Sequence, residues 1–576
     1  MKFLLALFIL QIPFLALYFY RLVEKYHIYC PNREFLGWDA NLRMTTTLDT
    51  MDSLRNFDIL LLLKTIFDSP TWPVLRNLLE AAFFFITSPQ PDNDVYFTLL
   101  TFLLLFACLA CILVRYTDRH WSSALLFAVF CIWVFQSQPI LLYSFSGMLE
   151  IQGALFVITS SYLLYLLLTA TTAPKNNWLL FLSFQLLYHT KYPYGYMFLL
   201  ASAVFYLLLY PRQATSIASS YLLHLRKSRT VWVLAVLVAL YFLFPQQLAH
   251  GKGPKYFKYL LFLGLSIHVL LWFAKERVEL SHLDQGIFVS LFWTLALPIL
   301  VWTMIHPDRF SSSSGTISHI QSEGLAPGIV AEKNLQYFLF YLREMQSIVF
   351  SNTTSWMILA LFFLALAKGS LALFHRVTPQ ASFFLAGLAF LQILMLTFFT
   401  QNHQARHIYH LYPAIFLAGL LLLFEQKNFR HLLVLPLFAL ATGYFALTAG
   451  ATYQKTHVCF SGIDTEPYRL PRWIRQNSGL LTENSIIYNY INPLHVNKSD
   501  AEMRLSIAAY EKNIRLLFDP RNFHSVNGYR EMIFLGNDCG IKNNLQRIHP
   551  QLLKASPQLV AEIRGEGCIL KYKLHQ

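Results

Sequence analysis

Residues 95–114 read VYFTLLTFLLLFACLACILV, a run of twenty residues without a single charged side chain. A helix of that length spans about 30 Å, the thickness of the hydrocarbon core of a bilayer. Further apolar runs lie at 3–20, 121–137, 150–170, 177–189, 193–210, 230–245, 257–274, 286–305, 356–374, 381–400, 409–424 and 431–450. The pattern predicts an α-helical polytopic membrane protein with about thirteen transmembrane helices.

The composition agrees with this class. Charged residues make up 13% of the chain and hydrophobic residues 56%, whereas soluble domains have about 25% charged residues. The formal charge of +14 is scattered between the apolar runs, so it does not indicate a nucleic-acid partner. The run at 3–20 is followed by Arg21 without a small-residue cleavage site, which favours an uncleaved first helix.

Basic residues in the connections predict the orientation. With the N-terminus in the cytoplasm, Lys or Arg occurs in each cytoplasmic connection, at 115–120, 171–176, 211–229, 275–285, 375–380 and 425–430. Loops 21–94 and 306–355 then lie on the outer face, together with the C-terminus. Residues 177–210 leave two interpretations open, two spans or one helix broken near Pro193, and a single helix would invert every later loop.

The chain divides into a membrane domain, 1–450, and a tail, 451–576, in which the apolar runs stop. Strand-like runs at 486–490, 515–518, 532–535 and 567–573, with a helical stretch at 470–477, predict a small soluble α/β domain on the outer, periplasmic face. Cys539 and Cys568 are candidates for a disulfide, with Cys459 as a rival partner. Loop 306–355 is either a mobile lid or a plain linker.

Five polar residues at predicted outer helix ends are candidates for chemistry. Asp39 and Arg43, in the segment GWDANLRM at 37–44, are one helical turn apart. Glu150 begins a predicted span, where a carboxylate carries a desolvation cost. Lys191 and Arg406 lie among His, Tyr and Asn residues, and could bind a phosphate headgroup or simply extend to the interface.

These residues occur in an order that resembles the GT-C glycosyltransferases that use lipid-phosphate-linked sugars, the superfamily of protein O-mannosyltransferases and the bacterial aminoarabinose transferase. The matching segments are Trp38–Arg43, Thr71–Pro73, Met148–Glu150, Thr190–Pro193 and His410–Pro413. The chain departs from the pattern at Ala40, where many members have Glu. Asp39 is therefore the only acid of the first motif.

The resemblance implies an inverting transfer of a sugar from a polyprenyl phosphate to an acceptor hydroxyl on a glycolipid, lipopolysaccharide or cell-surface glycan at the outer face. Asp39 would act as the general base. The donor phosphate would be bound by Lys191, Arg406 and Arg43. The residues expected to orient the substrate are Glu150, Trp38, Tyr192 and His403. We expect no metal ion or other cofactor, and a location in the bacterial inner membrane.

Two alternatives remain. The same fold could transfer sugar to a protein hydroxyl, although no β-trefoil insert of the eukaryotic O-mannosyltransferases is evident. The chain could instead transport or flip a lipid-linked sugar, which would favour internal repeats and charges at mid-bilayer. The sequence has no evident repeat, and its candidate residues gather at one edge of the membrane.

Overall fold

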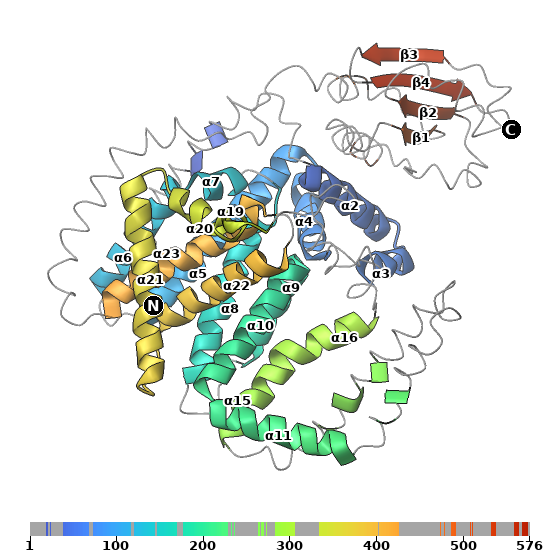
Figure 1. The fold of residues 1–576 in the computed structure, drawn as a ribbon. Helices are drawn as coiled ribbons and strands as arrows, with labels where there is room; N and C mark the ends of the chain where they lie inside the picture. Colours follow the sequence, from blue (N-terminus) through green and yellow to red (C-terminus); the bar gives the residue numbers. More distant parts are fainter. Residues whose placement is uncertain are drawn as a thin grey trace.

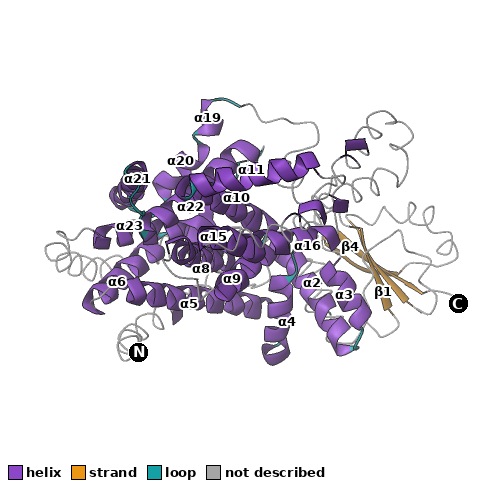
Figure 2. Cartoon of the chain, turned by 90° about the horizontal axis from the view of Figure 1, so that it is seen from below, coloured by secondary structure: helices purple, strands orange, loops and turns teal. Residues whose placement is uncertain are grey.

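The computed structural model describes residues 38–67, 73–116, 120–144, 147–169, 177–227, 283–305, 333–400, 403–425, 485–490, 531–536, 558–563 and 567–573, with a few isolated residues between them. A helical bundle makes up most of this part of the chain, and strands occur only in the C-terminal sheet (Figures 1 and 2).

Three helices precede the first long apolar one: α2 (Trp38–Arg55), α3 (Ile59–Phe67) and α4 (Leu75–Thr87). The bundle then contains α5 (Pro91–Tyr116), α6 (His120–Gln136), α7 (Gln138–Ser144), α8 (Glu150–Thr169), α9 (Asn177–Thr190), α10 (Tyr192–Leu209) and α11 (Pro211–Lys227). Next come α15 (Leu283–Leu291), the π-helical turn η2 (Phe292–Ala296) and α16 (Leu297–Ile305). The short helices α19 (Leu335–Phe338), α20 (Phe340–Glu344) and η3 (Met345–Ser347) precede α21 (Asn352–Phe374), α22 (Ala381–Phe399), η4 (Ala405–Leu411) and α23 (Tyr412–Glu425).

Seven of the described helical segments are long and apolar enough to cross a membrane. They are Asp92–Tyr116, Glu150–Thr169, Tyr192–Leu209, Gly286–Ile305, Asn352–Phe374, Ala381–Phe399 and Ala405–Glu425. The chain is therefore a multi-pass membrane protein, as predicted. The predicted spans 3–20, 230–245, 257–274 and 431–450 lie wholly or largely outside the described residues, so the total of thirteen stays a prediction.

Residues 177–210 form two helices rather than one broken helix. Helices α9 and α10 fold back on each other at Lys191, and the rings of Phe184 and Phe198 meet with centroids 5.7 Å apart. Gly195 permits the close approach, because a Cβ there would lie 2.4 Å from a ring carbon of Tyr188. Pro193 stands in the first turn of α10, where proline starts a helix without losing a hydrogen bond.

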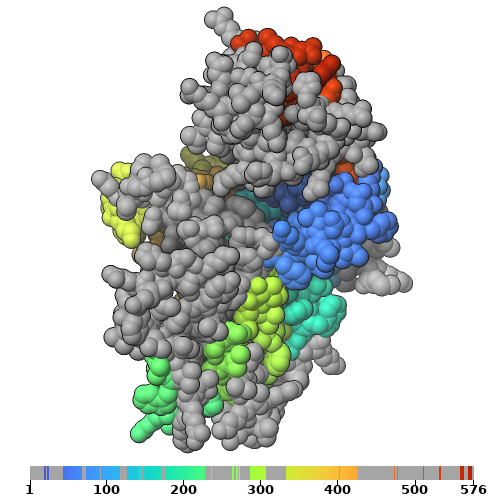
Figure 3. Space-filling view, turned by 90° about the vertical axis from the view of Figure 1, so that its right-hand side faces the viewer, coloured from blue at the N-terminus to red at the C-terminus, as the bar shows by residue number. Residues whose placement is uncertain are grey.

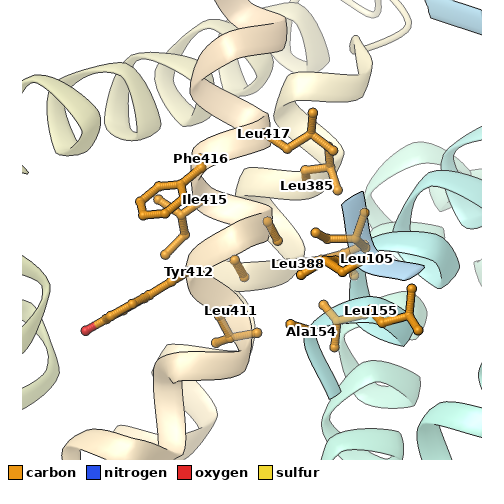
Figure 4. Packing of buried hydrophobic residues seen from close by; sticks show 14 of the residues in the cluster. Leu105, Ala154, Leu155, Leu385, Leu388, Leu411, Tyr412, Ile415, Phe416 and Leu417 are labelled. Carbon is orange, nitrogen blue, oxygen red and sulfur yellow. The ribbon is translucent and has the colours of Figure 1, made fainter. Parts of the chain in front are cut away.

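The buried centre of the bundle surrounds α23. Figure 4 shows Leu411 of η4 and Leu417 of α23 near Leu388 and Leu385 of α22, with Leu155 of α8 close by. Inside a bilayer such contacts stabilise the bundle through close packing, since lipid tails are as apolar as leucine.

One buried carboxylate, Glu425, joins four helices at the opposite end of α23. It accepts hydrogen bonds from the Tyr116 hydroxyl at 2.6 Å and from the Ser382 backbone N–H at 3.1 Å. Lys368 Nζ lies 3.9 Å from the same carboxylate. An acidic group at the N-terminus of α22 also interacts favourably with the helix dipole.

The tail contains a four-stranded sheet in the order β1-β2-β4-β3: β1 (Ser485–Tyr490), β2 (Glu531–Gly536), β4 (Gly567–Lys573) and β3 (Gln558–Ile563). Strands β1 and β2 are parallel, and the other pairs are antiparallel. The strands predicted at 486–490, 532–535 and 567–573 are confirmed, and β3 was not predicted. The strand expected at 515–518 and most of the helix expected at 470–477 lie outside the described residues.

The tail makes one described contact with α2 and contains a disulfide bond. Arg55, at the end of α2, donates a hydrogen bond to the Tyr510 carbonyl at 3.1 Å, and its guanidinium lies 4.5 Å from the centre of the Tyr510 ring. Cys568 on β4 is disulfide-bonded. Its partner lies outside the described residues, so the choice between Cys539 and Cys459 stays open.

Candidate active site at one end of the bundle

Several helix ends that carry polar residues meet at one end of the bundle. Glu150 is the first residue of α8, Lys191 joins α9 to α10, and η4 leads into α23. Because successive spans run in opposite directions, these ends come to the same side, and η4 packs against α8. Helix α2, which carries Arg43, packs on α4, and α4 packs on the beginning of α5.

Arg43 links α2 to the start of α8. Its guanidinium Nη2 donates to the carbonyl of Gly147 and lies 3.5 Å from the sulfur of Met148. These two residues immediately precede the turn into α8 that begins with Glu150. Trp38 and Asp39 form the first turn of α2, so the backbone of Asp39 lies one turn before Arg43. The side chains of Trp38 and Asp39 are outside the described part of the structure.

Below Arg43 lies a buried polar network that the sequence analysis did not predict. Arg76 on α4 donates through Nη2 to Asp94 and, at 2.9 Å, to Thr98, both on α5. Glu80 lies 3.7 Å from Arg76 and accepts a hydrogen bond from Thr47 of α2 at 2.9 Å. The three charged residues are each at most 2% exposed. One buried cation therefore faces two acids.

The charge of this network balances if one acid keeps a proton. Burial, with the nearby Asp94 carboxylate, raises the pKa of Glu80 well above its usual range. A neutral Glu80 can donate to Asp94 while it accepts from Thr47, and Arg76 is then paired with a single negative charge.

The network also fixes the segment that leads into α8. A Cβ at Gly147 would overlap the carboxylate of Asp94, so only glycine lets this segment lie against α5. Asn77 of α4 donates to the backbone carbonyl of Arg43 at 3.2 Å. Helices α2, α4 and α5 and the start of α8 are thus held together by polar contacts around Arg43.

Lys191 lies beside the same first turn of α8. Its Nζ is 5.3 Å from the centre of the Tyr194 ring, and that ring stacks on His410 with centroids 3.8 Å apart. The Tyr194–His410 stack requires a residue without a side chain at Gly153, one turn after Glu150, because a Cβ there would lie 2.5 Å from Tyr194. Lys191 and Glu150 are both buried. Arg43 and Lys191 therefore both lie near the first turn of α8, which begins with Glu150.

The other predicted residues have different surroundings. The Tyr192 hydroxyl accepts a hydrogen bond from Trp302 of α16 at 3.0 Å. His403 stacks on Tyr337 with centroids 3.8 Å apart, and its Nε2 lies 3.2 Å from the Thr397 carbonyl. Arg406, in the first turn of η4, donates from Nε to Gln404 at 2.7 Å. Tyr192 therefore contacts α16, and His403 contacts Tyr337 and the end of α22.

Asp49 is a second carboxylate of interest on α2. Part of its side chain is exposed, yet its carboxylate is closely surrounded by protein. A carboxylate can reach solvent and still lose much of its hydration to the protein around it. This desolvation, with a contribution from Asp52, raises the pKa of Asp49 to about 6. A carboxylate of that pKa is a suitable base near neutral pH, which makes Asp49 a rival to Asp39.

Among the residues that the structure describes, no group of three or more His, Cys, Asp or Glu side chains is arranged to hold a metal ion. The expectation of a reaction without metal stays a prediction.

The fold is that of the GT-C glycosyltransferases, so the predicted fold class is confirmed. Crystal structures of ArnT from Cupriavidus metallidurans share it. The form bound to undecaprenyl phosphate has a TM-score of 0.51 at 10% identity, and the apo form 0.50 at 11%. Both alignments cover 97% of this chain and 98% of ArnT.

The archaeal oligosaccharyltransferase AglB from Archaeoglobus fulgidus, in complex with an inhibitory peptide and a dolichol-phosphate, has a TM-score of 0.44 at 13% identity. That alignment covers 98% of this chain and 74% of AglB. No protein-family pattern and no curated protein sequence matches this chain. Identities this low establish a shared fold and leave the chemistry to the residues of this chain.

Proposed function

We propose that this protein is an integral membrane glycosyltransferase. It moves one sugar from a polyprenyl phosphate to a hydroxyl of a glycolipid, lipopolysaccharide or cell-surface glycan at the outer face of the inner membrane. The observation that carries the proposal is the meeting of Arg43, Glu150 and Lys191 at the first turn of α8, within a GT-C fold. The ArnT structure with the same fold holds undecaprenyl phosphate, which supports this class of donor.

The proposed reaction is a direct displacement at the anomeric carbon. The acceptor oxygen forms a bond to that carbon while the bond from carbon to the phosphate oxygen breaks, which inverts the configuration. The acceptor proton passes to Asp39 as general base. The leaving phosphate gains negative charge, which Lys191 and Arg43 stabilise, with Arg406 as a third donor.

The proposed roles of the remaining residues concern orientation. Glu150 is buried at the start of α8 and can accept hydrogen bonds from sugar hydroxyls. Trp38 and His403 would offer aromatic surface to the substrate. The Tyr192 hydroxyl accepts a hydrogen bond from the indole N–H of Trp302, so the proposed contribution of Tyr192 is the placement of α10 and of the adjacent Lys191.

We also propose the orientation that the basic loops predict, with the N-terminus in the cytoplasm and the tail, 451–576, in the periplasm. The disulfide at Cys568 supports it, because structural disulfides form in oxidising compartments. Both the donor headgroup and the acceptor are then on the outer side.

Donor recognition can be tested without knowledge of the sugar. Purified protein in nanodiscs should be stabilised by undecaprenyl phosphate, by about 2.7 kcal/mol at a hundredfold excess over the dissociation constant. Lys191→Gln should weaken binding, whereas Lys368→Gln, at the opposite end of the bundle, should not. No stabilisation of the wild-type protein by undecaprenyl phosphate would remove the basis for the donor class.

A further inference from the structure

Helix α3 has an unusual surface for a segment of loop 21–94, which was predicted to lie on the outer face of the membrane. It reads ILLLLKTIF, and none of its nine residues is buried. Leu60 is 81% exposed and Ile59 63%. A short apolar helix with most of its side chains exposed gains little from packing on the protein, and in water it would be an aggregation hazard.

Local hydrogen bonds define both the end of α2 and the start of α3. Helix α2 ends in a hydrogen bond from the Asp58 N–H to the Ser53 carbonyl at 2.8 Å, with Phe57 in the left-handed region at a φ of 52°. The side chain of Asp58 then caps α3 by accepting from the Leu61 N–H at 2.9 Å. Phe57 occupies a position that favours glycine, and the residue is 87% exposed, which extends the apolar surface of α3.

Helix α3 lies next to a lipid-facing part of the candidate span Gly286–Ile305. The ring of Phe67, at the end of α3, lies 5.6 Å from the ring of Trp302, near the end of the candidate span Gly286–Ile305. Val301 and Ile305 of the same span are about half exposed, as expected of a lipid-facing helix. Figure 3 shows the blue surface of the segment that includes α3 open to view between the C-terminal sheet, in red, and the yellow-green span.

We infer that α3 is immersed in the membrane leaflet on its side of the bilayer, with lipid acyl chains against Leu60 and Leu63. The apolar surface of α3 continues that of the span at the level where the acyl chains end, and tryptophans such as Trp302 are typical of that level. Lys64 is the only charged residue of α3 and can extend its ammonium group to the lipid phosphates. Because α3 follows α2 directly, it holds α2 at a fixed height above the leaflet, and this consequence alone rests on the proposed function.

The experiment uses the full-length protein in nanodiscs of phosphatidylethanolamine and phosphatidylglycerol. Benzoylphenylalanine, which inserts into nearby C–H bonds on irradiation, replaces Leu60 in one variant and Leu63 in a second. The control places the same group at Asn56, which is exposed at the end of α2. Mass spectrometry of the irradiated peptides should find phospholipid attached at positions 60 and 63, and not at 56.

Two results would overturn the inference. A cross-link from positions 60 and 63 to a second copy of the chain would show a protein interface. Equal, lipid-free spectra at all three positions would place α3 in water. Two probe positions are used so that the result does not depend on a local effect at one of them. The readout needs no sugar transfer, so its outcome is independent of the proposed function.

Discussion

At the residue scale, Asp39 and Arg43 share one face of α2, and only Arg43 has a described side chain, bound to the segment before Glu150. The general-base role predicts that Asp39→Asn lowers sugar transfer by about 10²- to 10⁴-fold, because an amide cannot accept the acceptor proton. Transfer measured in membranes, with expression and thermal stability as checks on folding, tests this prediction.

Asp52→Asn, on the same helix, is the matched control and should retain transfer. Asp49→Asn separates the two candidate bases. Loss of transfer in the Asp49 variant together with full activity of the Asp39 variant would assign the base to Asp49, whose pKa of about 6 would then give an activity that falls below pH 6.

The buried network around Arg76 gives a prediction about stability. Because folding raises the pKa of Glu80, the folded state keeps a proton that the unfolded state has lost above pH 4.5, the usual pKa of this group. This acid therefore makes the protein less stable as the pH rises from 4.5 towards the folded pKa. Glu80→Gln retains a donor and an acceptor and removes this loss, so the variant should equal or exceed the wild-type protein at pH 8.

Thermal unfolding in detergent at pH 5 and pH 8 measures the effect, and a variant that is much less stable at both values would refute a neutral Glu80. The double variant Glu80→Gln with Asp94→Asn leaves the Arg76 charge without an acid. It should lose about 3–5 kcal/mol, far more than Glu80→Gln alone.

The sequence indicated some of these residues and not others, for physical reasons. Glu150 and Lys191 attract notice because a charge at the end of an apolar run is rare. Arg76 and Glu80 lie in loop 21–94, which was predicted to be on the outer face, and charged residues are common in such loops. Only the packing of α4 on α5, which brings Asp94 beside them, makes them a buried site.

At the scale of elements, the contact between α8 and α10 depends on a single small residue. A side chain at Gly153 must collide with the Tyr194–His410 stack. Gly153→Val should therefore cost about 1–3 kcal/mol through overpacking and displace Lys191 from the first turn of α8. Thermal unfolding and binding of undecaprenyl phosphate both report the change.

Gly286→Ala is the matched control, because a Cβ at that helical glycine meets nothing within 4 Å. It should be neutral or stabilising, by up to about 1 kcal/mol, as expected when alanine replaces glycine in a helix. Equal effects of the two substitutions would show that Gly153 matters only for helix propensity and not for the approach of α10.

Long apolar runs predicted their helices well, since length and hydrophobicity suffice for a span. Two shorter elements needed the structure. Strand β3 is at the edge of the sheet with Leu559 exposed, so it lacks the alternation that marks a half-buried strand. Helix α3, with nine residues, is about 14 Å long and too short to span a bilayer, and its sequence alone did not separate it from a loop.

At the scale of the whole molecule, the orientation decides whether the site faces the outer leaflet. Alkaline phosphatase fused after Gln576 should be active in cells, because that enzyme folds only in an oxidising compartment. Green fluorescent protein fused at the same position and exported unfolded should stay dark. The reverse result would place the disulfide-bonded tail and the Arg43–Lys191 region on the cytoplasmic side.

The central claim is that this protein transfers a sugar from a polyprenyl phosphate to a surface molecule. The most direct measurement is mass spectrometry of lipid-linked sugars and surface glycans in a strain that lacks the gene. The account predicts an accumulated polyprenyl phosphate-sugar and a glycolipid or glycan short by one sugar residue, both restored by the wild-type gene and not by the Asp39→Asn variant. Unchanged lipid-linked sugars with unchanged surface molecules would contradict it. A sugar missing only from proteins would move the acceptor to a protein hydroxyl.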